Sequence, residues 1–384
     1  MKGVIKVMSA DELYLCRNKP TNRDGKYPVS LFGTQRAQLV NDFHRQFEEY
    51  GVTPLVSLKC LASRLGIGNL FVKDESFRFG QNSFKVLGSS YAVANIMAQR
   101  SESGINENDR RMTFITATDG NHGRGLAWTA KSLGQKCIVY LPQGSAKERV
   151  DAITALGAKA IVTECNYDDT VRIASRCAQE PGAVLVQDTA WDGYEDIPIW
   201  IMQGYTTMAY EIMSQLAGIK PTHIFLQAGV GSFAAAMTAF FIDLFGRNEK
   251  PIITVVEPFK ADCLYQSAAA GDGEIRFAKG NLDSIMAGLN CGEPNPVAWD
   301  ILKNYADFFV AVSDVVTEEG MKILASPVGD DVKISSGETG AVCVGLVAEI
   351  MKENGGNSYL KLREELGMDE KSSIMCFSTE GIIF

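Results

Sequence analysis

The sequence lacks several features that would place it in a specialised class of protein. Nine cysteines are present, but no two form a C-x-x-C pair and the chain has only three histidines, so neither a zinc site nor a disulfide framework is expected. Cys263 and Cys291 could pair under oxidising conditions, yet two free buried thiols are the expectation. No metal site is predicted.

Basic residues are also in deficit. The chain has 37 lysines and arginines against 46 aspartates and glutamates, which gives a formal net charge of −9. This excess of negative charge repels phosphate backbones and anionic lipid. Nucleic acid and membrane surfaces are therefore not expected as partners, and a small molecule is.

A targeting or membrane-spanning segment is not predicted either. The first fifteen residues have no sustained apolar run followed by a small-residue cleavage site, so we expect a cytoplasmic protein. One uncharged stretch, residues 224–242, is long enough to span a membrane. Gly229-Val230-Gly231-Ser232 interrupts it, however, and a buried strand, a tight turn and a buried helix explain the same composition. We interpret the stretch as core.

The composition that remains is that of an ordinary globular protein with 46% hydrophobic and 22% charged residues. At 384 residues the chain exceeds a single core, which predicts two or three domains. From residue 112 to residue 187, short β-branched runs alternate with amphipathic stretches. This rhythm predicts repeated βαβ units and a mostly parallel sheet covered by helices. After a turn-rich passage and a long helix near residues 198–216, the rhythm resumes, so a second α/β unit is expected.

Four turns rich in glycine or serine fall where strands should end and helices begin, which is where ligands of open α/β sheets bind. They are Asn82–Gly88, Thr118–Gly123, Gly229–Ser232 and Phe377–Gly381. The first contains Lys85, which begins an apolar stretch. Burial there would lower the pKa of the Lys85 amine, and an amine that condenses with a carbonyl needs such a lowered pKa. An ordinary exposed lysine is the alternative.

The second and third turns each allow two interpretations. Asp119, Asn121 and His122 could form a ligand site or only a helix cap and turn. Gly229–Ser232 directs backbone N–H groups and a helix N-terminus at one point, which suits a phosphate. It also reads G-x-G-x-x-A, with Glu257 ending the next strand, so an NAD-binding Rossmann protein is the alternative from a different class.

Taken in chain order, these turns resemble the fold-type II, or tryptophan synthase β-like, family of pyridoxal-phosphate (PLP) enzymes. The family's T-P-L, L-x-x-x-L-G and K-D-E motifs match residues 53–55, 61–66 and 73–75, and Ser83-Phe84-Lys85 matches the S-F-K of dehydratases. The resemblance extends over nearly the whole chain.

The resemblance implies an architecture and an assembly. We expect two open, mostly parallel twisted sheets with helices on both faces, and an active site between two domains. Residues 1–88 and 193–384 would form a large PLP-binding domain, and residues 89–192 a small α/β domain. A homodimer is expected on the same ground.

The resemblance also implies roles for individual residues. Lys85 would form the Schiff base with pyridoxal 5'-phosphate, Phe84 would pack beside its ring, and Asn121 would hydrogen-bond its phenolic oxygen. Ser378 would face the pyridine nitrogen. The phosphate would be held by four residues of the third turn: Gly229, Val230, Gly231 and Ser232.

Departures from the dehydratase pattern point to one branch of the family. Where dehydratases have S-S-G-N-H, this chain has Thr118-Asp119-Gly120-Asn121-His122. Asp119 is the informative change, and residues 186–198, 201–205, 286–294, 335–341 and 377–381 resemble diaminopropionate ammonia-lyases. We therefore expect a carbon–nitrogen lyase that converts 2,3-diaminopropionate, D and L, to pyruvate and two ammonia. A serine or threonine dehydratase is the nearest alternative.

The expected reaction needs carboxylates near the substrate. An amine leaves only as neutral ammonia, so an acid must hold or return a proton at Cβ. Asp119 and Asp188 are the candidates, and either could also bind the β-ammonium by a charge-assisted hydrogen bond. Asp188 could instead cap the turn that follows it. Ser83 is expected to contact the substrate. Lys85 is predicted as the base for the L isomer and Asp119 for the D isomer.

Overall fold

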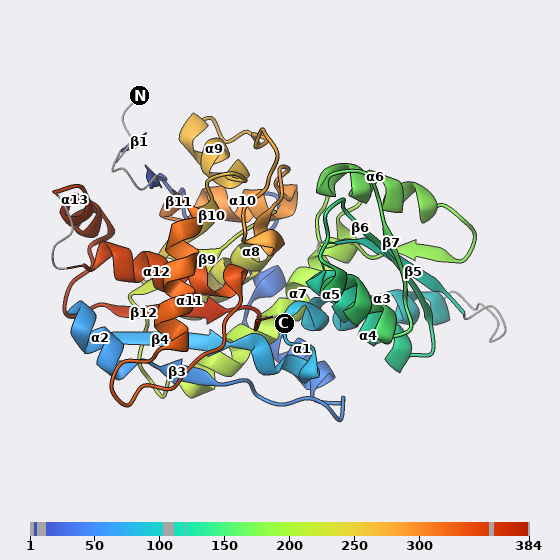
Figure 1. Ribbon diagram of the computed structural model, residues 1–384, viewed down its shortest axis with the longest axis horizontal. Helices are drawn as coiled ribbons and strands as arrows, with labels where there is room; N and C mark the ends of the chain where they lie inside the picture. Colours follow the sequence, from blue (N-terminus) through green and yellow to red (C-terminus); the bar gives the residue numbers. More distant parts are fainter. Residues whose placement is uncertain (1–3, 6–12, 103–110, 119, 353–356, 383–384) are drawn as a thin grey trace.

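The computed structural model describes residues 4–5, 13–102, 111–118, 120–352 and 357–382. The chain forms two sheets, one of eight strands and one of four. Figure 1 shows the two sheet units side by side, the eight-stranded unit on the left and the four-stranded unit on the right. The expected fold class, two mostly parallel sheets with helices, is confirmed.

The larger sheet has the strand order β1-β2-β11-β10-β9-β12-β4-β3. Its strands are β1 (Val4–Ile5), β2 (Tyr14–Arg17), β3 (Leu55–Ser57), β4 (Asn69–Asp74), β9 (His223–Gln227), β10 (Ile252–Pro258), β11 (Phe308–Val312) and β12 (Ser373–Ser378). The five strands from β11 to β4 in this order pair in parallel, whereas β2 pairs antiparallel with β1 and β11, and β3 pairs antiparallel with β4.

The smaller sheet is parallel throughout, in the order β7-β6-β5-β8. Its strands are β5 (Thr113–Ala117), β6 (Lys136–Leu141), β7 (Lys159–Val162) and β8 (Ala183–Leu185). Its helices are α4 (Asn121–Ser132), α5 (Lys147–Ala155) and α6 (Tyr167–Cys177). Strands and helices alternate here as the sequence predicts.

The remaining helices cover the larger sheet and connect the units. They are η1 (Val29–Phe32), α1 (Thr34–His44), α2 (Lys59–Leu65), η2 (Glu75–Gly80), α3 (Lys85–Glu102), α7 (Asp196–Gln215), α8 (Ser232–Phe245), α9 (Cys263–Ala270), η4 (Ala287–Leu289), α10 (Pro296–Tyr305), α11 (Asp314–Ala325), α12 (Glu338–Ile350) and α13 (Asn357–Leu366). Met375 and Phe377 of β12 pack into one apolar cluster with α7 and α8, and Ile374 and Cys376 pack into another with α12. Both faces of the sheet are therefore buried, as is usual for parallel sheets.

The uncharged stretch at residues 224–242 forms β9, a turn and α8, whose side chains are buried in the core. Among the described parts of the chain, no helix is long and apolar enough to cross a membrane. The interpretation of this stretch as core is confirmed.

Part of the K-D-E motif enters a buried ion network. Lys73 Nζ lies 2.6 Å from Glu211 Oε2, and the Arg78 guanidinium bonds both Glu75 and Glu211 at 2.7–2.8 Å. Buried charges are tolerated only when they are paired and hydrogen-bonded in this way. The network connects β4 and η2 to α7, and so fixes the segment that leads to Lys85.

Helices α3 and α7 approach each other closely through glycines. A Cβ on Gly204 would lie 2.4 Å from the Leu87 carbonyl oxygen, and a Cβ on Gly88 would lie 2.6 Å from the Tyr205 ring. Both contacts are too short for any larger side chain, so this helix pair needs glycine here. The first turn of α3, which carries Lys85, is thereby held against α7.

Candidate active site

A cavity of about 350 Å³ is lined by residues of both sheet units. It lies at the carboxyl ends of strands, where the four predicted turns meet. From these turns it is lined by Ser83, Phe84, Lys85, Thr118, Asn121, Gly229, Val230, Gly231, Ser232, Thr379 and Glu380. The sequence separates these residues by nearly 300 positions, and the two sheets bring them together.

Lys85 and Asp188 form an ion pair across this cavity. Lys85 is the first residue of α3, Asp188 follows β8, and Lys85 Nζ lies 2.5 Å from Asp188 Oδ2. The side chains are 20% and 7% exposed. Burial alone would raise the pKa of Asp188, but the Lys85 ammonium and the nearby His122 lower it to about 2. Asp188 is therefore ionised at neutral pH, and its carboxylate binds the amine instead of capping the following turn.

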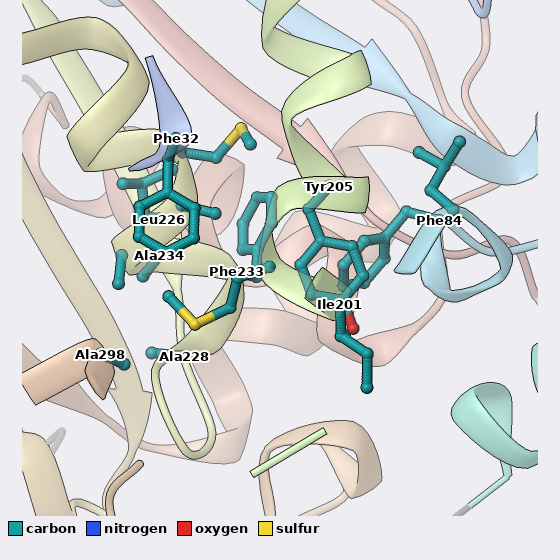
Figure 2. Close-up of a cluster of buried hydrophobic side chains, with 14 of the residues drawn as sticks. Phe32, Phe84, Ile201, Tyr205, Leu226, Ala228, Phe233, Ala234 and Ala298 are labelled. Carbon is teal, nitrogen blue, oxygen red and sulfur yellow. The ribbon is translucent and has the colours of Figure 1, made fainter. Parts of the chain in front are cut away.

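Phe84 anchors the lysine on an apolar wall. Its ring centroid lies 4.7 Å from that of Tyr205 and 5.2 Å from that of Phe233, and Figure 2 shows these rings gathered with Ile201. Lys85 Nζ lies 5.5 Å from the Phe84 centroid. The packed rings leave the lysine backbone little freedom, while Phe84 still lines the cavity.

The turn before α8 has the geometry of an anion cradle. Gly231 has φ +97°, a backbone conformation that favours glycine, and α8 begins at Ser232. The N–H groups in the first turn of a helix have no acceptor within the helix, so this end attracts anions. Ser232 Oγ donates to the Asp188 carbonyl at 2.8 Å and accepts from Asn295 Nδ2 at 2.9 Å. The cradle is thus fastened to the segment that carries Asp188.

Glu257 excludes the alternative of a dinucleotide site. Its side chain is fully buried and accepts the N–H groups of Leu264 at 2.9 Å and Tyr265 at 2.6 Å. Burial raises its pKa well above the usual range. Glu257 therefore caps the start of α9 and offers nothing to a ribose, although a Rossmann site would need it for that purpose.

Asn121 and His122 are neighbours in the chain but have different hydrogen-bond partners. The Asn121 amide donates to Glu380 and accepts from Arg124 Nη2 at 3.0 Å. His122 is buried, and its Nε2 lies 2.7 Å from the Val186 carbonyl oxygen. Asp119 lies outside the described residues, between Thr118 and Gly120, and Thr118 and Asn121 both line the cavity.

The serines predicted for the site differ in their access to the cavity. Ser83 lines it, and its hydroxyl accepts the Lys85 N–H at 3.4 Å. Ser378 is fully buried, is not part of the lining, and donates to Ser336 Oγ at 2.8 Å. The cavity wall after β12 is instead formed by Thr379 and Glu380. The role of Ser378 at a pyridine nitrogen stays a prediction.

Sequence reasoning assigned no role to several residues that line the cavity. Glu380 belongs to the fourth turn, and Thr339 and residues 287–291 lie in segments that resemble diaminopropionate ammonia-lyases, but no role was predicted for their side chains. Tyr167 lies in no motif. The Thr339 hydroxyl is buried and, among the described residues, has no hydrogen-bond partner. The three-dimensional arrangement shows that these groups share one cavity.

The two cysteines near the cavity are free thiols, as expected. Cys263 and Cys291 are both buried, and Cys263 Sγ lies 3.9 Å from the Gly229 carbonyl oxygen. Within the described ranges, no group of His, Cys, Asp and Glu side chains could hold a metal ion.

The cavity fits the PLP that the resemblance implies. Lys85 supplies an amine in a mostly buried setting, and the α8 turn supplies a cradle for a phosphate. The unpartnered Thr339 hydroxyl is a polar group that a bound ring or its substituents would satisfy. The volume is within the usual range for small-molecule sites.

The Asp188 carboxylate predicts a specific pH dependence of stability for the cofactor-free protein. Its pKa is about 2 in the folded chain and ~3.9 when unfolded. The stabilisation, about 3 kcal/mol, is present above pH ~4 and is lost as the pH falls towards 2. Chemical denaturation between pH 2 and 5 should show a loss of stability that is larger in wild type than in Asp188→Asn by this amount, because Glu211 and other paired carboxylates titrate in both proteins. Parallel curves for the two proteins would contradict the ion pair.

The comparisons with known proteins agree with this geometry. Residues 47–355 match the family model described as pyridoxal-phosphate dependent enzyme. The chain is 46% identical over 362 residues to diaminopropionate ammonia-lyase of Escherichia coli strain K12, covering 91% of this chain and 89% of that protein. It is also 46% identical to the enzyme of the same name from Salmonella typhimurium strain LT2, covering 92% and 91%.

A solved structure gives the same result. It is that of diaminopropionate ammonia lyase from Escherichia coli in complex with the aminoacrylate-PLP azomethine reaction intermediate. It superposes with a TM-score of 0.89 at 43% identity and covers 97% of this chain and 94% of that chain. The chain therefore belongs to the family of pyridoxal-phosphate dependent enzymes and, within it, to the diaminopropionate ammonia-lyases.

Proposed function

We propose that this chain catalyses the PLP-dependent α,β-elimination of 2,3-diaminopropionate to pyruvate and two ammonia. The observation that carries the proposal is the meeting of Lys85 and Asp188 beside the Gly229–Ser232 cradle. An amine for the cofactor, a carboxylate for the β-ammonium and a cradle for the phosphate are thus joined in one cavity. The names of the similar proteins support the same reaction.

PLP, when bound, accepts the electrons that are released on loss of the Cα proton. The chain must hold the cofactor, remove that proton and bind the leaving amine. Lys85 would hold the cofactor and, once its amine is released, would take the Cα proton of the L isomer. Phe84 would support the ring, Asn121 would hydrogen-bond the phenolic oxygen, and the cradle would hold the phosphate.

Asp188 has the properties needed to bind the β-ammonium. While the Lys85 ammonium lies beside it, the low pKa of Asp188 keeps the carboxylate ionised. When the Lys85 amine is bound to the cofactor, its charge no longer faces Asp188, and a β-ammonium is a natural replacement. The β-ammonium then keeps the Asp188 carboxylate ionised as Lys85 did, and its hydrogen bond to Asp188 keeps the proton on the amine, so that the amine leaves as neutral ammonia.

The proposed domain bounds, assembly and location, and the roles of two serines, rest on the resemblance to fold-type II PLP enzymes. We propose a large PLP-binding domain of residues 1–88 and 193–384, a small domain of residues 89–192, and a cytoplasmic homodimer. Ser83 would contact the substrate, and Ser378 would face the pyridine nitrogen. The separate four-stranded sheet at residues 113–185 supports the domain division.

The alternative within the family is a serine or threonine dehydratase. Purified protein should have a visible absorption band, since a lysine-bound cofactor is yellow. Pyruvate release should have a kcat/KM ~10- to 100-fold higher for diaminopropionate than for serine, because only the former offers an ammonium to Asp188. A preference for serine would favour the dehydratase, and a colourless protein that PLP does not colour would overturn the proposal.

Asp119 predicts the use of both enantiomers. Lys85 can reach the Cα proton from one side of the cofactor plane only, so the D isomer needs a second base, and Asp119 is the proposed one. Asp119→Asn should lower pyruvate release from D-diaminopropionate ~10²- to 10⁴-fold and largely spare the L isomer. Asp188→Asn is the matched control and should impair both isomers alike, since both carry a β-ammonium. Equal losses with Asp119→Asn would leave Asp119 as a binding residue.

A further inference from the structure

Glu380 is a buried carboxylate in the wall of the cavity. It lies two residues after β12, and its side chain is almost fully buried. One carboxylate oxygen accepts from the Asn121 amide, and the other accepts the Thr339 N–H at 3.2 Å. A carboxylate at such a place is costly unless both oxygens are hydrogen-bonded.

The surrounding backbone is built to hold this side chain. The Glu380 carbonyl accepts the Gly337 N–H at 2.9 Å, and residue 380 forms an antiparallel bridge with Ser83, two residues before Lys85. A Cβ on Gly337 would lie 3.0 Å from Glu380 Cγ and 3.1 Å from Glu380 Oε1. Glycine at 337 therefore makes the space that the glutamate occupies.

Asn121 lies between a group that only donates and a group that only accepts. Its Oδ1 accepts from Arg124 Nη2 at 3.0 Å, and its Nδ2 donates to Glu380. An arginine has no acceptor, and an ionised glutamate has no donor. The amide therefore has one favourable orientation, with its NH₂ group on the Glu380 side. One N–H of that group serves Glu380, which leaves the second for an acceptor in the cavity.

We propose that Glu380 is a positioning residue that fixes the Asn121 amide so that it presents an N–H, and not its carbonyl, to the phenolic oxygen of PLP. The inference rests on the proposed function, which places that oxygen beside Asn121. A reversed amide would direct its carbonyl oxygen at an oxygen that carries negative charge. Glu380 thus acts on the cofactor through Asn121 and has no direct contact with the substrate.

The test measures PLP affinity and the pH titration of the visible band, in addition to turnover. Glu380→Gln can satisfy only one of the two donors, and Glu380→Asp is too short to reach Asn121. Both should weaken PLP affinity roughly 10- to 100-fold and shift the pH at which the band titrates. Glu338→Gln removes a neighbouring carboxylate that is not part of the cavity lining, and should leave both readouts at wild-type values.

A double-mutant cycle with Asn121→Ala separates positioning from direct action. If Glu380 acts through Asn121, adding Glu380→Gln to Asn121→Ala should change PLP affinity less than about 2-fold, because the two effects are not additive. Folding of each variant is verified by circular dichroism, and Glu380→Asp is the readout if the Gln variant does not fold.

Three results would overturn the inference. The first is that both Glu380 variants keep wild-type PLP affinity and wild-type titration of the visible band. The second is that Glu380→Gln weakens PLP affinity as much in the Asn121→Ala background as it does in wild type. An equal loss of PLP affinity in Glu338→Gln would show that removing any nearby negative charge has this effect, and that the contact of Glu380 with Asn121 is not its cause. Wild-type protein that shows no band and no elimination would overturn the proposed function itself, and is therefore distinguishable from these results.

Discussion

The ion pair between Lys85 and Asp188 is the interaction on which the site depends. Lys85 follows β4 of the larger sheet and Asp188 follows β8 of the smaller sheet, so the pair joins the two units at the cavity. The hydroxyl of Ser232 adds the α8 cradle to the same point through the Asp188 carbonyl. In the chemistry proposed above, the Lys85 amine would hold the cofactor, and the substrate's ammonium would replace it beside Asp188. The pair thus joins the two units in the structure, and in the proposed reaction its carboxylate would select the substrate.

The apolar core determines where the lysine can be. Phe84 is packed between Tyr205 and Phe233, and α3 approaches α7 at Gly88 with no room for a larger side chain. The buried network around Glu211 holds the preceding segment from the other side. A reactive amine is therefore supported by a rigid framework, as a catalytic group that must keep its geometry requires.

Much of this arrangement follows from local patterns in the sequence. The alternation of strands and helices, the core assignment of residues 224–242 and the convergence of the four turns were all predictable, because strand ends of parallel sheets share one edge. The sequence predicts both Lys85 and Asp188 as site residues, but it does not predict the ion pair between them. It depends on how the two sheets are placed relative to each other, and no local pattern encodes that placement.

The same limit explains what was missed. Glu380 and Ser378 are two residues apart on one turn. The resemblance to the family assigns a cofactor contact to Ser378 and none to Glu380. The chain turns after β12 so that the Ser378 hydroxyl meets Ser336 and the Glu380 carboxylate lines the cavity. Similarly, the role of Glu257 as the cap of α9 required knowledge of where α9 begins.

Lys85 is the residue proposed to bind the cofactor, and the rest of the proposed chemistry depends on it. Borohydride reduction of the PLP-loaded protein, followed by proteolysis and mass spectrometry, tests this most directly, because reduction makes the lysine–cofactor bond permanent. We expect a single phosphopyridoxyl group, on the peptide that contains Lys85. The same modification on another lysine, with the Lys85 peptide unmodified, would contradict it.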